Sequence, residues 1–114
     1  MKVTEYEPTG VAVFDVDVSL MQEAGTTFRN RLDDVISRGY RNIVLDMTNT
    51  SYMNSVSISI MLEAQRKLKD SGGDIVLSNV NQLIRNLFEI TNMTSIIRIL
   101  PDNESALHEF RKAI

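Results

Sequence analysis

The residue types that carry out acid–base, metal or nucleophilic chemistry are scarce in this chain of 114 residues, which has no cysteine and a single histidine, His108. Thiolate chemistry and cysteine-based zinc sites are therefore excluded. A Ser-His-Asp triad or a histidine metal site would have to use His108. His108 lies between Leu107 and Glu109 in a helical pattern, and we expect it to be a solvated helix residue.

Two acidic pairs are the candidates for a metal site. Asp15 and Asp17 alternate along an expected strand and so share one face of it. Asp33-Asp34 falls on the polar side of an expected helix. A hard cation would need further oxygen ligands, and none converge with either pair in the sequence. We expect both pairs to be solvated, and we expect no metal and no cofactor.

Binding to phosphate, nucleic acid or membrane has little support in the sequence. Neither a phosphate loop (GxxxxGK before Ser or Thr) nor GxGxxG occurs, and Gly72-Gly73 follows a helical pattern, which is typical of a helix stop. Four arginines that could bind phosphate lie close together in the sequence: Arg29, Arg31, Arg38 and Arg41. Asp33 and Asp34 lie among them and offset their positive charge. Twelve basic and fifteen acidic residues give a net charge of −3, a poor balance for holding nucleic acid directly. No apolar run of about 18 residues and no signal-peptide core occur, so we expect a cytoplasmic protein without membrane insertion.

The segment Thr48–Ser59 stands out because it joins a buried strand to a long helix. Functional loops of open α/β sheets lie beyond the carboxyl ends of their strands. Two interpretations are open. In the first, Asn54 or Ser55 caps the helix by accepting a hydrogen bond from a free amide of its first turn. In the second, Ser55 is a modification site, where a phosphate would add about −1.5 to −2 charges beside the positive end of the helix.

The elements that position this segment can be predicted from apolar periodicity. Residues 11–18 predict a strand that is buried on both faces in its first half, preceded by an extended piece, Val3 to Glu7, with Pro8-Thr9-Gly10 as the turn of a hairpin. Helical spacing then links six apolar residues before a helix stop at Gly39: Met21, Ala24, Phe28, Leu32, Val35 and Ile36. Ile43–Leu45 predicts a central strand, and Asp46–Ser51 a polar loop.

The second half repeats the alternation of helix and strand. A helix is expected over Ser55–Ser71 and a strand at Ile75–Leu77. Asn79 or Asn81 should cap a third helix with the apolar face Leu83, Ile84, Leu87 and Phe88. A strand at Ile96–Leu100 ends at Pro101. Asp102 or Asn103 should cap a last helix whose inward residues are Leu107, Phe110 and Ile114.

The order ββαβαβαβα predicts an α/β fold. Strands that alternate with helices favour a mostly parallel sheet with right-handed crossovers, and the opening hairpin makes the sheet mixed. We expect a central sheet of four to five strands with about four helices, in a single domain over residues 1–114.

Residues Arg41 to Leu100 resemble the STAS domain, and within it the bacterial anti-sigma factor antagonists. The resemblance rests on a buried strand, a turn that opens a helix, a Gly-Gly stop, a further strand and a short helix ending in Leu-Phe. These are Ile43–Met47, Ser51–Ser55, Gly72-Gly73, Ile75–Leu77 and Ile84–Phe88, followed by Ile96–Ile99. The resemblance implies the STAS fold over the whole chain.

The resemblance also implies partner switching. Such proteins bind an anti-sigma factor, a serine kinase of the histidine-kinase-like ATPase fold, when a serine is unphosphorylated, and so regulate transcription indirectly. The kinase phosphorylates the serine and the complex separates; a phosphatase resets it. The serine corresponds to Ser55, and the partner-binding residues would be Met53, Asn54, Ser55, Val56, Ser57 and Ile58. The resemblance implies no catalytic residue, and we expect a monomer when the chain is free.

Several positions depart from the family pattern. Asn54 replaces the usual Asp before the serine, and Val56-Ser57 replaces Ser-Gly, which is expected to add a side chain where a partner approaches. Val18 and Met21 stand where members commonly have Gly and Asp. These changes favour an alternative: a STAS binding module that is not phosphorylated, either a scaffold in a stress complex or the small cytoplasmic subunit of a lipid-transport ABC system. A small enzyme is a third reading, for which no convergent cluster of ionisable groups is visible.

Overall fold

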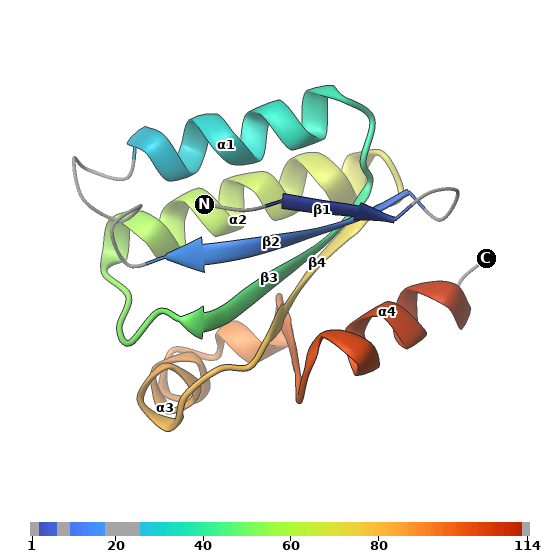
Figure 1. Cartoon of the computed structure of the whole chain (residues 1–114). Helices are drawn as coiled ribbons and strands as arrows, with labels where there is room; N and C mark the ends of the chain where they lie inside the picture. Colours follow the sequence, from blue (N-terminus) through green and yellow to red (C-terminus); the bar gives the residue numbers. More distant parts are fainter. Residues whose placement is uncertain (1–2, 7–9, 18–25, 113–114) are drawn as a thin grey trace.

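A five-stranded sheet forms the centre of the computed structural model, which describes residues 3–6, 10–17 and 26–112 (Figure 1). The strands lie side by side in chain order: β1 (Val3–Tyr6), β2 (Val11–Asp17), β3 (Asn42–Asn49), β4 (Asp74–Ser78) and β5 (Arg98–Leu100). β1 is antiparallel to β2, and β2 to β5 are parallel. The predicted hairpin and mixed, mostly parallel sheet are confirmed.

Helices cover both faces of this sheet. Helices α1 (Thr26–Ser37) and α2 (Ser55–Asp70) lie next to each other on one face, and α4 (Asn103–Lys112) lies on the other (Figure 1). α3 (Gln82–Ile90) and a short 3₁₀ turn, Met93–Ser95, connect β4 to β5. No helix in the described ranges is long and apolar enough to cross a membrane.

The strand pleat divides the apolar residues into two cores. On β2, Ala12 and Phe14 point toward α1 and α2, whereas Val11 and Val13 point toward α4. The larger core includes an edge-to-face pair of Phe14 and Phe28, with ring centroids 6.0 Å apart. Because both faces are covered, the first half of β2 is buried on both sides, as its apolar run predicts.

The predicted loop at Asp46–Ser51 is wrong in its first part, because β3 continues to Asn49. Asp46 pairs with Ser78 of β4, and Asn49 pairs with Asp17 of β2. Met47 is fully buried. Polar side chains at the end of a parallel strand therefore do not end it when neighbouring strands supply ladder partners.

Other elements differ from prediction in detail. Leu83 was expected on the apolar face of α3 but is 63% exposed, while Ile84 and Phe88 are buried. β5 begins at Arg98 rather than Ile96, because the chain first makes the 3₁₀ turn. Asn81, not Asn79, caps α3, and Asp102 accepts from the N–H of Ser105 at the start of α4. The predicted residues Glu7, Val18, Met21, Ala24 and Ile114, and Pro8 and Thr9 of the predicted hairpin turn, lie outside the described residues.

The predicted solvated groups are found largely at the surface. His108, Asp33 and Asp34 are exposed, and the helix stop at Gly39 has a positive φ of 95°. Asp15 is the exception, because it is half-buried and accepts a hydrogen bond from Asn49 at 3.2 Å. Asp15 is partly enclosed because α4 covers the face of β2 that it shares.

Candidate functional site at the start of helix α2

The loop between β3 and α2 is anchored to the sheet at its first residue. The Thr50 side chain is buried, and its hydroxyl donates to the carbonyl oxygen of Val16 at 2.8 Å. The N–H of Thr50 donates to the carbonyl of Met47 at 3.0 Å. The loop therefore leaves the sheet in a fixed direction, at the carboxyl ends of β2 and β3.

The same loop is joined to α3. The Asn81 side-chain amide donates to the carbonyl of Ser51 at 2.9 Å, while its Oδ1 accepts from the N–H of Ile84 at 2.8 Å. One asparagine thus caps α3 and holds the loop that leads into α2. Met53 inserts its side chain into the larger core. The start of α2 is consequently held in a fixed position by contacts with the sheet, with α3 and with the larger core.

Asn54, rather than Ser55, is the cap of α2. It has extended backbone angles, φ −109° and ψ 174°, and its Oδ1 accepts from the N–H of Ser57 at 2.9 Å. In return, the Asn54 N–H donates to the Ser57 hydroxyl at 3.1 Å. This reciprocal capping box fixes the first turn and leaves Ser55 outside it.

The six residues predicted to bind a partner fall into two groups. Asn54, Ser55 and Val56 are exposed at the surface, Val56 to 38%. The other three face inward to different degrees, because Met53 and Ser57 are buried and Ile58 is half-buried. The expectation that Ser57 adds a side chain at the partner surface is wrong, because its hydroxyl is turned into the cap.

One surface residue of this loop is missing from the sequence prediction. Tyr52 is 52% exposed and precedes the cap. The aromatic side chain in this short loop is the signal that could have identified it, since solvent-exposed tyrosine is enriched at protein interfaces. Tyr52 therefore joins Asn54, Ser55 and Val56 among the exposed residues at the start of α2.

Replacing Asn54 with alanine is expected to lower the free energy of unfolding by about 1 kcal/mol, because the Ser57 N–H loses its acceptor. Asn54→Asp keeps the acceptor and places a carboxylate at the positive end of α2, so its stability should equal or exceed that of the parent chain. Urea unfolding of the three proteins measures both effects. An equal loss in both variants would contradict the capping role.

A second polar group, the Asp46 cluster, lies at the same carboxyl edge of the sheet on the α4 side. It consists of Asp46, Thr48, Ser78, Asn79 and Asn103. Asp46 Oδ1 accepts from the Thr48 N–H and hydroxyl and from the Asn79 amide at 3.1, 2.6 and 3.0 Å, and Oδ2 accepts from the Asn103 amide at 2.9 Å. Ser78 donates to Asn103. The donors come from Thr48 of β3, from Asn79 directly after β4 and from Asn103 of α4. The Asp46 carboxylate therefore links these three elements.

The pKa of Asp46 lies below its ordinary value. Burial alone would raise this pKa, but the hydrogen bonds from Thr48, Asn79 and Asn103 together outweigh burial. Because the folded pKa is lowered, the Asp46 contribution to stability is present above the unfolded pKa of roughly 4 and is lost as pH falls through the folded value.

Asp46→Asn should therefore reduce the free energy of unfolding at pH 7, and the difference from the parent should shrink as the pH falls below about 4. Denaturant unfolding at a series of pH values measures it. A difference that is constant between about pH 7 and pH 3 would show that the charge of Asp46 is not what these donors stabilise.

Known proteins share both the sequence pattern and the fold. BtrV of Bordetella bronchiseptica, a candidate anti-sigma factor antagonist, is 28% identical over 79 residues, or 69% of this chain and 68% of BtrV. The anti-sigma F factor antagonist of Paenibacillus polymyxa is 24% identical over 101 residues, covering 88% of this chain and 86% of that protein.

Solved structures show the same architecture. TM1081 of Thermotoga maritima superposes with a TM-score of 0.84 at 21% identity, covering 96% of this chain and 87% of the other. Unphosphorylated SpoIIAA, a Bacillus protein, gives 0.79 at 19% identity, with 99% and 97% covered, and its phosphorylated form gives 0.65 at 18%, with 95% and 96% covered. The family model described as the STAS domain matches residues 2–106. The chain belongs to the STAS domain family.

Proposed function

We propose that this protein is an anti-sigma factor antagonist that acts by partner switching. In this proposal the unphosphorylated chain binds an anti-sigma factor that is also a serine kinase of the histidine-kinase-like ATPase fold. Phosphorylation of Ser55 separates the two, and a phosphatase restores the binding form. Membership of the STAS family and the antagonist names of its relatives support this function.

The observation that carries the proposal is the placement of Ser55. It is the first residue of α2, it is exposed, and its hydroxyl takes no part in the capping box of Asn54 and Ser57. A kinase can therefore reach the hydroxyl without unwinding the helix. The exposed neighbours Tyr52 and Val56 supply apolar area on the same surface.

A phosphate on Ser55 would change the surface more than the fold. The positive end of the helix dipole favours an anion there. The capping box already satisfies the Ser57 N–H, and the Asn54 carbonyl accepts from Ile58. The phosphate would thus add about −1.5 to −2 charges to a structured surface. A partner surface that fits the neutral serine would have to remove water from the phosphate without pairing its charge, and this cost weakens binding.

Ser55→Glu is expected to weaken binding of the kinase at least about tenfold, whereas Ser55→Ala should bind like the parent and accept no phosphate. Ser37→Ala is the matched control and should bind like the parent, because Ser37 is also an exposed helical serine but lies at the end of α1, where its hydroxyl donates to the Asp34 carbonyl at 2.8 Å. Calorimetry with the purified kinase measures affinity, and mass spectrometry after incubation with ATP locates the phosphate. Equal affinity of Ser55→Glu and Ser55→Ala would refute partner switching.

The alternative is a STAS binding module that is not phosphorylated, and the observation favouring it is the neutral Asn54 beside Ser55. A carboxylate in its place would accept a hydrogen bond from the serine hydroxyl more strongly than an amide does. The Asn54→Asp variant separates the two functions. A partner-switching protein should accept phosphate at least as fast in this variant as in the parent chain, whereas a constitutive module should bind its partner with Ser55 unmodified in both.

A further inference from the structure

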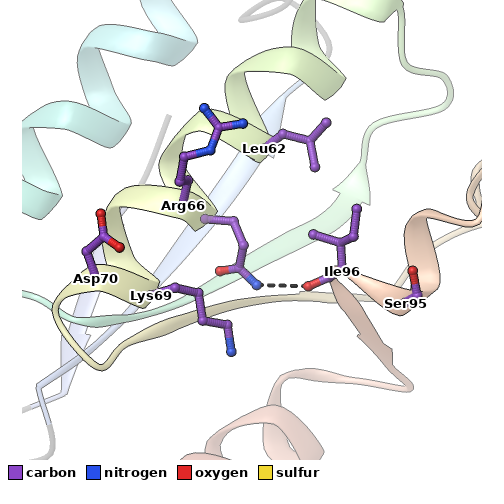
Figure 2. Close-up of a pocket in the computed structure, with 7 residues that line it drawn as sticks. Leu62, Arg66, Lys69, Asp70, Ser95 and Ile96 are labelled. Atoms are coloured by element: carbon purple, nitrogen blue, oxygen red, sulfur yellow. Dashed lines mark hydrogen bonds between the residues drawn. The ribbon is translucent and has the colours of Figure 1, made fainter.

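A shallow groove of about 550 Å³ lies along the second half of α2 (Figure 2). Leu62, Arg66 and Lys69 of α2 line one side of it, and Ser95 and Ile96 line the other. Asp70 stands at the end of the helix, on the same wall. This surface is separate from the six residues predicted from the sequence to bind a partner.

Gln65 gives the groove a fixed floor. Its side chain is buried, its amide donates to the Ile96 carbonyl at 3.0 Å, and its Oε1 accepts from the N–H of Ile75 at 2.8 Å. The wall formed by residues 95–96 is therefore tied to α2 through a side chain that cannot easily move. A groove that is already formed costs little conformational entropy to occupy.

The groove is continuous with the surface around Ser55. Leu62 and Arg66 follow Ser55 at positions i+7 and i+11 of α2, so all three lie on one face of the helix. Ser59, at i+4, lies between them and is exposed. Seven residues of helix span roughly 10 Å, so Leu62 is within reach of any partner segment that lies along α2 from Ser55.

The chemistry of the groove is apolar with a positive side. Leu62 is half-buried against the larger core and Ile96 is 49% exposed. Arg66 has no ion pair with any residue that the structure describes, and Lys69 is 3.5 Å from Asp74. Because Asp74 pairs with Lys69, Arg66 is the cation of this lining that keeps no ion-pair partner among the described residues, and it is the group that can take a carboxylate.

We propose that this groove binds a segment of the same kinase partner that presents an apolar side chain next to a carboxylate. The apolar side chain would lie between Leu62 and Ile96, and the carboxylate would pair with Arg66. This inference rests on the proposed function. It makes α2 a two-part docking surface, in which Ser55 carries the switch and the groove contributes affinity that does not depend on the switch.

Two charge and size changes test the groove against matched controls. Arg66→Glu and Ile96→Ser should each weaken binding of the purified kinase by about tenfold. Arg111→Glu makes the same charge change on α4, across the sheet, and Ile90→Ser removes an isoleucine that is 84% exposed at the end of α3. Both controls should bind within about twofold of the parent, a margin well below one hot-spot contact. Thermal unfolding of each variant checks that the fold is kept.

The outcomes separate this inference from the proposed function. If Ser55→Glu weakens binding while Arg66→Glu and Ile96→Ser do not, the switch stands and the groove proposal is overturned. If the kinase does not bind the parent chain, both fall. If Ile96→Ser instead abolishes a concentration-dependent dimer of the free chain, the occupant is a second copy and the proposal is also overturned. Support requires that Arg66→Glu weakens binding by a similar factor in the parent chain and in the Ser55→Glu variant.

Discussion

Gly73→Ala is expected to lower the free energy of unfolding by about 3 kcal/mol or more, although it adds a single methyl group. An ideal Cβ at this position would lie 1.9 Å from the carbonyl oxygen of Arg41 and 2.7 Å from its carbonyl carbon. That oxygen cannot move aside freely, because it accepts from the N–H of Asp74 at 3.0 Å where β4 begins beside β3. The Gly73 N–H is also bound, to the carbonyl of Leu68 at 2.7 Å. The added methyl must therefore displace backbone.

Gly72→Ala is the matched control. Gly72 has a φ of +81° and nothing within 4 Å of an added Cβ, so alanine there meets only the conformational cost of about 1 kcal/mol. Urea and thermal unfolding of the two variants give the comparison, at roughly 4 °C in Tm for each kcal/mol. A loss at Gly73 no greater than that at Gly72 would show that β3 and β4 separate at this end without cost.

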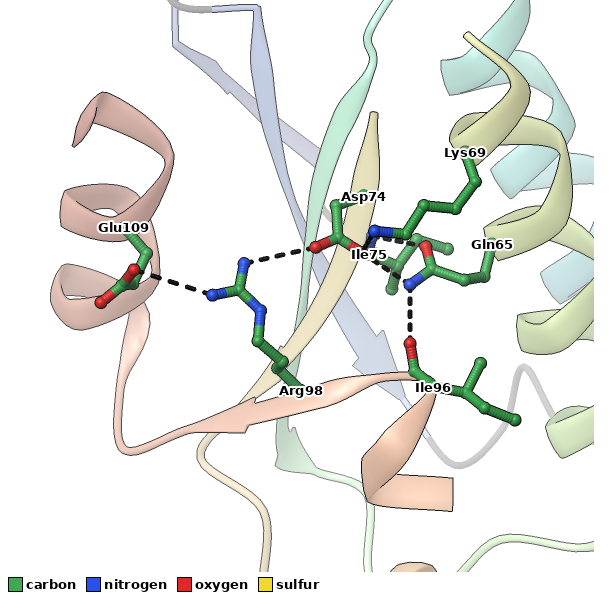
Figure 3. A network of polar contacts seen from close by, with 7 residues as sticks. All are labelled: Gln65, Lys69, Asp74, Ile75, Ile96, Arg98 and Glu109. Carbon is green, nitrogen blue, oxygen red and sulfur yellow. Dashed lines mark hydrogen bonds and ion pairs between the residues drawn. The ribbon is translucent and has the colours of Figure 1, made fainter. Parts of the chain in front are cut away.

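Gln65→Ala is expected to cost about 3 kcal/mol, far more than a typical surface glutamine. Gln65 is 3% exposed and joins three parts of the fold (Figure 3). Its amide donates to Asp74 Oδ1 at 2.6 Å and to the Ile96 carbonyl at 3.0 Å, and its Oε1 accepts from the N–H of Ile75 at 2.8 Å. Truncation leaves the buried Ile75 N–H without its acceptor, removes the amide donor from Asp74 and from the Ile96 carbonyl, and opens a cavity beneath α2.

The same network continues to the far face of the sheet. Arg98 of β5 lies 3.3 Å from Asp74 and 3.7 Å from Glu109 of α4 (Figure 3). The Arg98 side chain is half-exposed, so each of these outer ion pairs contributes at most about 1 kcal/mol. We therefore expect the effect of Gln65→Ala to come from its own three hydrogen bonds and its buried volume.

Gln82→Ala provides the control for the glutamine prediction. Gln82 is exposed at the start of α3 and donates to Asn86 at 2.7 Å, so its removal should change stability by less than about 0.5 kcal/mol. Denaturant unfolding measures both variants, with hydrogen exchange at the Ile75 amide as a local readout. Similar losses for Gln65→Ala and Gln82→Ala, or an unchanged exchange rate at Ile75, would contradict the role given to Gln65.

Local patterns in the sequence specify most of the elements. Alternating apolar residues specify β2, and helical spacing specifies α1 and α2, because side-chain period follows backbone geometry. The stop at Gly72-Gly73 and the position of Ser55 at the opening of α2 are also local properties. The α/β class and the mostly parallel sheet could be predicted from the order of these elements, because short right-handed crossovers allow few arrangements of alternating strands and helices.

Contacts between distant parts of the chain set the features that the sequence left open. β3 extends through Asp46 because β2 and β4 supply its hydrogen bonds and because Asn79 and Asn103, far along the chain, satisfy its carboxylate. Position 73 must be glycine because the carbonyl of Arg41 occupies the space that a Cβ would take. The spacing of residues along the chain cannot reveal this contact. The two ends of a contact separated by many residues leave no periodic signal in the sequence.

The candidate site divides in the same way. A serine that opens α2 beyond a buried strand could be predicted, because a cap, a helix start and an apolar run are local patterns. The sequence could not determine which neighbours of Ser55 face outward, since a single turn of helix places Val56 at the surface and Ser57 against the loop. Nor could it show the groove of Leu62 and Ile96, whose two walls meet only when β5 joins the sheet beside β4 and the segment before it docks on α2.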